Sequence, residues 1–206
     1  FAIFLIFTSL FFLIPKFFNF ENKQETIKAH LLKYYDLEIK DYNNIEYQIF
    51  PFPNLSIQNV DLKIKDKPIV LKTHNINIFL EIKKIYKFEN FKTKRILLNG
   101  SQASLNINKA KDLINYLNKL KYDLVVKNLS IDFKRDNISL IKIKNINFSN
   151  YGFKRYNFTG QLLGKKIKAK LINNNKNLKF KILKTGIKAD FELDNKNSYL
   201  EDNIAG

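Results

Sequence analysis

The sequence predicts a mainly β protein, in which an N-terminal transmembrane helix and a short amphipathic helix precede an antiparallel meander with one helical insert. Two observations lead to this fold class. Residues 1–14 form an uncharged apolar run, and from residue 36 onward apolar side chains alternate with lysine or asparagine. The predicted parts are a membrane anchor at residues 1–18, a juxtamembrane helix at 19–35 and a β-rich extramembrane domain at 36–206.

The first predicted element is the anchor. Residues 1–14 read FAIFLIFTSLFFLI, in which only Thr8 and Ser9 are polar. A bilayer span needs about 20 apolar residues, and because the sequence lacks a starting Met we expect the anchor to be truncated at its start. We also expect the β-rich domain to be incomplete at its C-terminus, because no capping element follows its last alternating segment. A secretory signal would end at a small-x-small cleavage site, whereas residues 15–20 are rich in aromatic side chains that suit a membrane interface. An uncleaved anchor is therefore the favoured interpretation.

Two segments have the apolar spacing of amphipathic helices. The apolar stripe recurs at i, i+4, i+5 and i+8 in residues 21–35, and at i, i+3, i+4 and i+7 in residues 109–120. We expect the first helix to lie just outside the bilayer and the second to interrupt the strands. The stripe residues are Ile27, Leu31, Leu32 and Tyr35 in the first helix, and Ala110, Leu113, Ile114 and Leu117 in the second.

The remaining segments alternate with period two, which predicts strands with one dry face and one wet face. The alternation slips at Gln58 and Asn59, where we expect a β-bulge. Short turn signals separate the strands, so the sheet is expected to be antiparallel, because parallel strands need long crossover connections. The predicted turns are at residues 99–100, 135–137, 150–152, 164–165, 173–175 and 185–186.

The dry face of such a sheet must be buried against a second sheet, against helices of the same chain or against a lipid-like ligand. Two short helices are too small to cover eight or more strands. A closed sandwich or barrel core and a curled groove that holds acyl chains both remain open at this point. The candidate lipid-facing residues are Leu105, Ile107, Leu129, Ile131, Phe133, Ile143 and Phe148.

The formal net charge of +17 does not by itself predict a nucleic-acid partner. Among 36 basic residues the arginines are only Arg95, Arg135 and Arg155, and recognition of bases and phosphates relies on the arginine fork. Lysine, asparagine, isoleucine, phenylalanine and tyrosine share A/T-rich codons, so a compositional bias accounts for the lysines as a solvated face. We therefore expect no nucleic-acid partner.

No catalytic or metal-binding pattern emerges from the sequence. His30 and His74 lie in different predicted elements without other ligands at metal-binding spacing, and the chain has no cysteine. The carboxylates are scattered, and the glycines match neither a phosphate-binding loop nor a dinucleotide fingerprint. We expect a protein that is not an enzyme and that carries no cofactor or metal.

The most distinctive segment is residues 50–60, which read FPFPNLSIQNV. With its surroundings, this segment resembles the N-terminal region of the AsmA-like family, in which a membrane helix and a short amphipathic helix precede a proline-rich turn into lipophilic strands. The family-like turn residues are Pro51, Pro53, Leu55 and Asn59. Looser likenesses follow at residues 76–82, 91–100 and 122–131, whereas residues 83–89 read KKIYKFE and lack the glycine of the family pattern.

The resemblance covers most of residues 1–160 and carries specific implications. It implies a single-pass protein of the bacterial inner membrane with its β-rich part in the periplasm. It also implies a role in envelope biogenesis, in which phospholipid is handled or bridged toward the outer membrane through an apolar β-sheet groove, with other envelope proteins as potential partners. The alternatives are a membrane-tethered structural or adhesive β-sandwich without lipid transport, and a lysine-rich surface that binds nucleic acid or anionic lipid.

Overall fold

The computed structural model describes residues 1–206 except 19, 51, 82–85, 87–91, 173–176 and 193–206. Its helices are α1 (Ala2–Leu13), α2 (Gln24–Tyr35) and α3 (Ala110–Lys119), with 3-10 turns at Ile14–Phe17, Glu21–Lys23 and Ile107–Lys109. Its strands are β1 (Leu37–Asp41), β2 (Asn44–Gln48), β3 (Asn54–Ile64), β4 (Val70–Leu80), β5 (Thr93–Asn106), β6 (Leu124–Arg135), β7 (Ile138–Ser149), β8 (Asn157–Leu162), β9 (Lys165–Ile172), β10 (Asn177–Ile182) and β11 (Lys188–Glu192).

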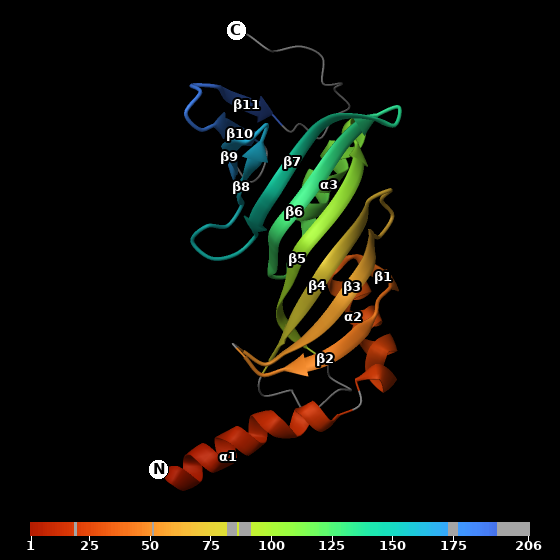
Figure 1. Cartoon of the computed structure of the whole chain (residues 1–206), viewed down its shortest axis with the longest axis vertical. Coiled ribbons are helices and arrows are strands. Elements are labelled where there is room, and N and C mark those ends of the chain that lie inside the picture. Colours follow the sequence, from red (N-terminus) through yellow and green to blue (C-terminus); the bar gives the residue numbers. More distant parts are fainter. Residues whose placement is uncertain (19, 51, 82–85, 87–91, 173–176, 193–206) are drawn as a thin grey trace.

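The described strands form one 11-stranded sheet, which confirms the mainly β fold class (Figure 1). The strand order is β1-β3-β4-β5-β6-β7-β8-β9-β10-β11, and β2 also pairs with β3. The predicted all-antiparallel meander is wrong at one place, because β5 and β6 are parallel neighbours. Parallel neighbours need a crossover connection, and the predicted helical insert, now α3, is that connection.

A single shift in side-chain alternation occurs in the middle of five consecutive strands, β3 to β7. Inward-facing residues otherwise lie two apart, but here they step by three, as from Ile57 to Val60 in β3 and from Ile143 to Ile146 in β7. The extra residue has a left-handed backbone in four of these strands: Asn59 in β3, Gly100 in β5, Asn128 in β6 and Asn145 in β7. Without it, each later half-strand would turn its apolar side chains to the wet face.

The register places these residues side by side across the sheet. Gln58, Asn75, Asn99 and Lys127 are consecutive partners, and each of the residues that follow Gln58, Asn99 and Lys127 is left-handed. The predicted slip in alternation at Gln58 and Asn59 is therefore confirmed, but the predicted bulge is not seen between β3 and β4, because both strands advance by two residues from the Gln58–Asn75 pair to the Val60–Thr73 pair. The predicted turn at residues 99–100 is wrong, because Gly100 lies inside β5, where its positive φ of 67° accompanies the slip in alternation and not a chain reversal.

Helices α2 and α3 both lie behind the sheet in Figure 1 and contribute to one hydrophobic core with it. Ile27, Leu31 and Tyr35 of α2 are fully buried, so the apolar stripe of this helix packs in the core with the strands. In α3 the buried residues are Tyr116 and Leu117, and the predicted stripe residue Leu113 is partly buried against the core.

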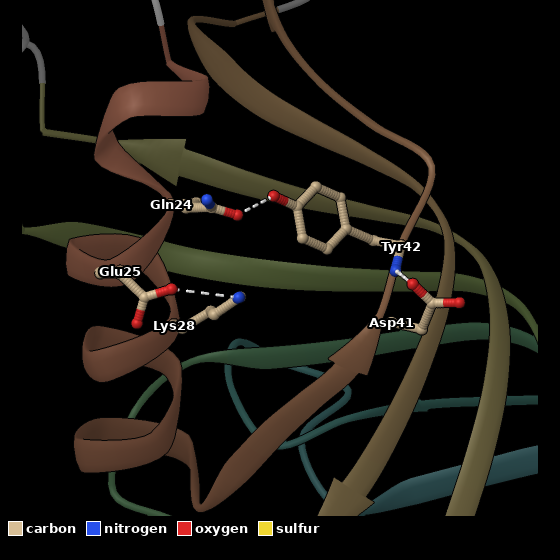
Figure 2. A network of polar contacts seen from close by, with 5 residues as sticks. All are labelled: Gln24, Glu25, Lys28, Asp41 and Tyr42. Carbon is tan, nitrogen blue, oxygen red and sulfur yellow. Dashed lines mark hydrogen bonds and ion pairs between the residues drawn. The ribbon is translucent and has the colours of Figure 1, made fainter.

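Polar contacts tie the start of α2 to the β1–β2 connection (Figure 2). The Tyr42 hydroxyl donates a hydrogen bond to the Gln24 side chain, and the Tyr42 backbone N–H donates to Asp41 Oδ1 at 2.9 Å. Lys28 Nζ lies 3.1 Å from Glu25 Oε1 and 5.7 Å from the centre of the Tyr42 ring. These contacts fix the angle at which the chain leaves α2 for the edge of the sheet.

Helix α1 lies apart from the sheet, at the opposite end of the molecule from β11 (Figure 1). It is apolar except for Thr8 and Ser9 and has no buried residue, although the Tyr86 hydroxyl donates a hydrogen bond to the Phe11 carbonyl at 2.5 Å. Its 12 residues span only about 18 Å, against about 30 Å for the apolar layer of a bilayer. Among the described residues no helix has the length and hydropathy that crossing a bilayer requires, so the predicted transmembrane helix at residues 1–18 is unsupported.

Replacement of Gly100 tests the row of left-handed residues. We expect Gly100→Ala to destabilise the fold by about 2 kcal/mol, because a side chain at positive φ is strained and the new Cβ would lie 3.1 Å from His74 Cβ. The matched control is Gly152→Ala, where φ is +74° and no atom lies within 4 Å. Urea unfolding measures both variants, and equal losses of stability would show that the approach to His74 does not constrain the sheet.

Candidate functional site

The apolar face of the sheet is the candidate site. One transverse row of this face follows the strand register without a break from the covered half of the sheet to its far edge. It includes two aromatic side chains, Phe148 and Phe158, that stack with ring centres 4.5 Å apart. The row runs Leu98, Val126, Phe148, Phe158, Ala169, Phe180 and Ala189.

Burial divides this face into a closed part and an open part. Over β3 to β6 the inward residues lie beneath α2 and α3, and Ile57 and Ile78 are fully buried. Toward β7 and β11 the cover ends, so that Ile141 is 42% exposed and Phe191 41% exposed, while Phe180 is half-buried. The open part of the apolar face comprises Phe133, Ile141, Ile143, Phe180, Ile182 and Phe191.

The predicted lipid-facing residues fall into both parts. Leu105, Leu129, Ile131 and Phe148 are buried, with Leu105 only 2% exposed, so they form the floor of the closed core. Phe133 and Ile143 are half-buried and adjoin the open part. Ile107 was expected in a strand but begins the 3-10 turn that leads into α3, because β5 ends at Asn106, whose side chain accepts a hydrogen bond from the Asn108 backbone N–H.

A buried polar cluster joins α2 to the sheet beneath the closed part. The His30 Nε2 and Tyr35 hydroxyl lie 3.0 and 3.1 Å from the Thr93 hydroxyl, and the Tyr116 hydroxyl of α3 donates to the Tyr35 carbonyl at 2.7 Å. Burial, with a smaller contribution from the positive charge of Lys33, lowers the pKa of His30 to about 4. Burial also raises the pKa of Tyr35 to about 12 and that of Tyr116 above its ordinary value. The cluster is therefore neutral near pH 7 and positions the two helices.

The family-like turn lies near the end of the sheet next to α1. Pro51 lies outside the described residues; Pro53 is buried and its carbonyl accepts a hydrogen bond from Leu80 at 3.2 Å. Leu55 is fully buried on the apolar face, and Asn59 begins the row of left-handed residues. Phe50 and Phe52 on either side of the turn are exposed.

A hollow of about 350 Å³ opens beside this turn. The Arg95 guanidinium carbon lies 4.3 Å from the centre of the Phe79 ring, and its Nη1 donates to the Tyr151 hydroxyl at 2.9 Å. These contacts occupy the guanidinium, so the hollow presents mainly apolar walls. Its lining residues are Phe52, Pro53, Phe79, Leu80, Glu81, Lys94 and Arg95.

The described residues contain no group of three or more histidine, cysteine or acidic side chains that could hold a metal ion. His30 is engaged with Thr93 in the core, and the other histidine, His74, is exposed on β4 opposite Gly100. The strands with the open apolar residues Phe180 and Phe191 were visible as alternating segments in the sequence, but alternation cannot show where helical cover ends.

The buried position of His30 predicts a pH dependence of stability. Because its pKa is near 4 in the folded chain and near 6.5 in the unfolded chain, its contribution to stability is complete above pH 6.5 and is lost as the pH falls toward 4. We expect the free energy of unfolding, measured by urea denaturation, to fall between pH 6.5 and 5 by up to about 1 kcal/mol per pH unit. His30→Gln should flatten this slope. His74→Gln is the matched control, and an equal flattening in that variant would contradict the assignment.

Comparison with known proteins gave no match for this chain among protein-family models, among curated proteins or among solved structures.

Proposed function

We propose that this chain is an AsmA-like envelope protein that shields the acyl chains of phospholipid on the open part of its apolar sheet face. The single observation that carries the proposal is the partial exposure of the apolar face from β7 to β11, where Ile141 and Phe191 are exposed and Phe180 is half-buried, although Ile167 and Leu171 of β9 remain buried. Soluble proteins rarely leave a large contiguous apolar surface uncovered unless it binds something apolar.

The sheet supports this role because its apolar face continues to the last described strand. The register carries apolar residues from β7 to β11, so an acyl chain laid on the face would remain in contact with hydrocarbon over several strands. The described strands belong to one sheet and not to two facing sheets, which favours the lipid-handling proposal over the tethered β-sandwich. The proposal involves no catalytic step.

Helix α1 supports a membrane location. It has no charged residue and no buried residue, and a helix that is apolar on nearly all sides is stable where it is surrounded by apolar groups. Phe17, Phe50 and Phe52 are exposed, and aromatic rings are enriched at bilayer interfaces. We therefore propose that α1 lies in the bacterial inner membrane and that the sheet extends into the periplasm, where it hands phospholipid toward the outer membrane.

Site-specific photocrosslinking tests the lipid contact. With p-benzoylphenylalanine in place of Phe180 of the full chain, irradiation in cells should yield an adduct with the mass of a phospholipid, detected by mass spectrometry. Gln102 is the matched control, because it is exposed on the opposite face of the sheet, on β5 and away from the lysines of β9 to β11. Absence of a lipid adduct at position 180, or equal adducts at both positions, would overturn the proposal.

Loss of lipid on substitution provides a second test. We expect Ile141→Asp combined with Phe180→Asp to reduce the lipid adduct formed by a crosslinker at position 191 several-fold, because a buried carboxylate is costly in contact with hydrocarbon. Both positions lie outside the fully buried core, so the fold should persist, and thermal unfolding checks this. Retention of the full adduct by a folded double variant would contradict the proposed surface.

A further inference from the structure

A cluster of lysines occupies the wet face of the last three strands. The register sets Lys168 directly opposite Lys181, and Lys170 opposite Lys179. Lys181 also faces Lys188 on its other side. Like charges directly opposite one another destabilise a sheet, so composition explains why lysines are frequent but not why they are aligned. The lysine face, all of it exposed, consists of Lys166, Lys168, Lys170, Lys179, Lys181 and Lys188.

Acidic side chains offset the positive charge of the lysine face only toward one end of β11. Asp190 and Glu192 of β11 share it, and among the described residues the one ion pair on it joins Lys179 to Asp190 at 3.8 Å. Both partners of this pair are more than half exposed, so it contributes little stability. The positive charge is therefore concentrated toward the turns that connect β8 to β9 and β10 to β11.

The β8–β9 turn places a leucine at a left-handed backbone position, which is unfavourable for this residue. Leu163 and Gly164 have φ angles of 49° and 75°, the pattern of a two-residue turn that favours asparagine followed by glycine. The β6–β7 turn uses Asp136 and Asn137 at the corresponding positions, with φ angles of 50° and 68°. Leu163 is also 91% exposed, so this side chain costs backbone strain and gives no packing within the described chain.

The β10–β11 turn lies beside the β8–β9 turn and also exposes an apolar side chain. These two exposed apolar side chains, Leu163 and Ile187, are called the tips. The Leu183 backbone N–H donates to the Lys166 carbonyl at 2.8 Å, which holds the β10–β11 turn next to β9. Ile187 in this turn is 54% exposed. Two exposed apolar tips therefore adjoin a face of lysines, which is the arrangement that suits an anionic bilayer, because tips can enter the interface while ammonium groups approach lipid phosphates.

We propose that the lysine face and the tips Leu163 and Ile187 bind the surface of an anionic phospholipid bilayer. This surface lies at the end of the molecule opposite α1, so it is distinct from the proposed membrane contact of that helix (Figure 1). The lysines lie on the opposite side of the sheet from the apolar face, because they alternate with Ile167, Ala169 and Phe180 along the same strands. Ile187, by contrast, lies at the end of the apolar face, where its carbonyl accepts a hydrogen bond from Ile182. Nucleic acid suits the proposed surface less well, since the lysine face has neither an arginine fork nor an aromatic ring for stacking.

Vesicle flotation tests the proposal. The full chain is held in nanodiscs of phosphatidylcholine, which supplies α1 with neutral lipid, and is mixed with vesicles of phosphatidylcholine alone or with added phosphatidylglycerol. We expect the chain to float only with the anionic vesicles and to be released by salt. Equal flotation with both vesicles would overturn the proposal, and so would a DNA duplex that competes as strongly as anionic vesicles at equal phosphate concentration.

Two variants separate binding from folding. Lys168→Gln with Lys181→Gln should weaken vesicle partitioning about 30-fold, while the thermal midpoint stays unchanged or rises, because a like-charge pair is removed. Leu163→Asn should also weaken binding while it stabilises the turn. The control of equal charge is Lys72→Gln with Lys127→Gln on exposed positions of β4 and β6. Undiminished binding of the Lys168/Lys181 variant, or an equal loss in the control, would overturn the proposal.

Discussion

A row of left-handed residues across β3 to β7 determines which side chains the sheet presents on each face. In each strand the apolar residues before the row and those after it lie on the same face of the sheet, because one extra residue is inserted into the alternation between them. Asparagine and glycine fill these positions, since they tolerate positive φ better than other residues. The burial of both halves of β3 to β6, and so the single continuous core, depends on this row.

The parallel pair β5–β6 explains why the core is closed over one part of the sheet and open over another. The crossover between these strands must run over one face, and it takes the form of α3, which packs beside α2 through the Tyr116–Tyr35 hydrogen bond. Beyond β6 every connection in the described chain is a hairpin, which brings no helix over the sheet. The open apolar surface thus follows from the type of connection and not from a change in the composition of the strands.

The two faces of β9 to β11 have different physical characters within the same few residues. Alternation gives one face lysines and the other face Ile167, Ala169 and Phe180. Each face carries a cost that the described chain does not offset, since one leaves hydrocarbon in water and the other aligns like charges. A bound phospholipid would offset both costs, because its acyl chains would cover the apolar face and its phosphates would neutralise the lysines.

The sequence by itself determined the elements that have a local physical cause. The two amphipathic helices, the alternating strands and the slip in alternation at Asn59 each follow from the spacing of apolar residues over a few turns or pleats. The proline-rich turn was also visible, although Pro51 lies outside the described residues. The apolar face of the sheet could therefore be predicted, as could Phe133 and Ile143 near its open part.

Only the tertiary structure decided which parts of that face are covered. Leu105 and Ile131 have the same alternation as Phe180, yet the first two are buried beneath the helices and the last is not. Gly100 looked like a turn because glycine favours positive φ in turns and in bulges alike, and only the strand partners distinguish the two. The pairing of Lys168 with Lys181 is likewise a property of register, because residues far apart in sequence become neighbours only when hairpins set which strand positions face each other.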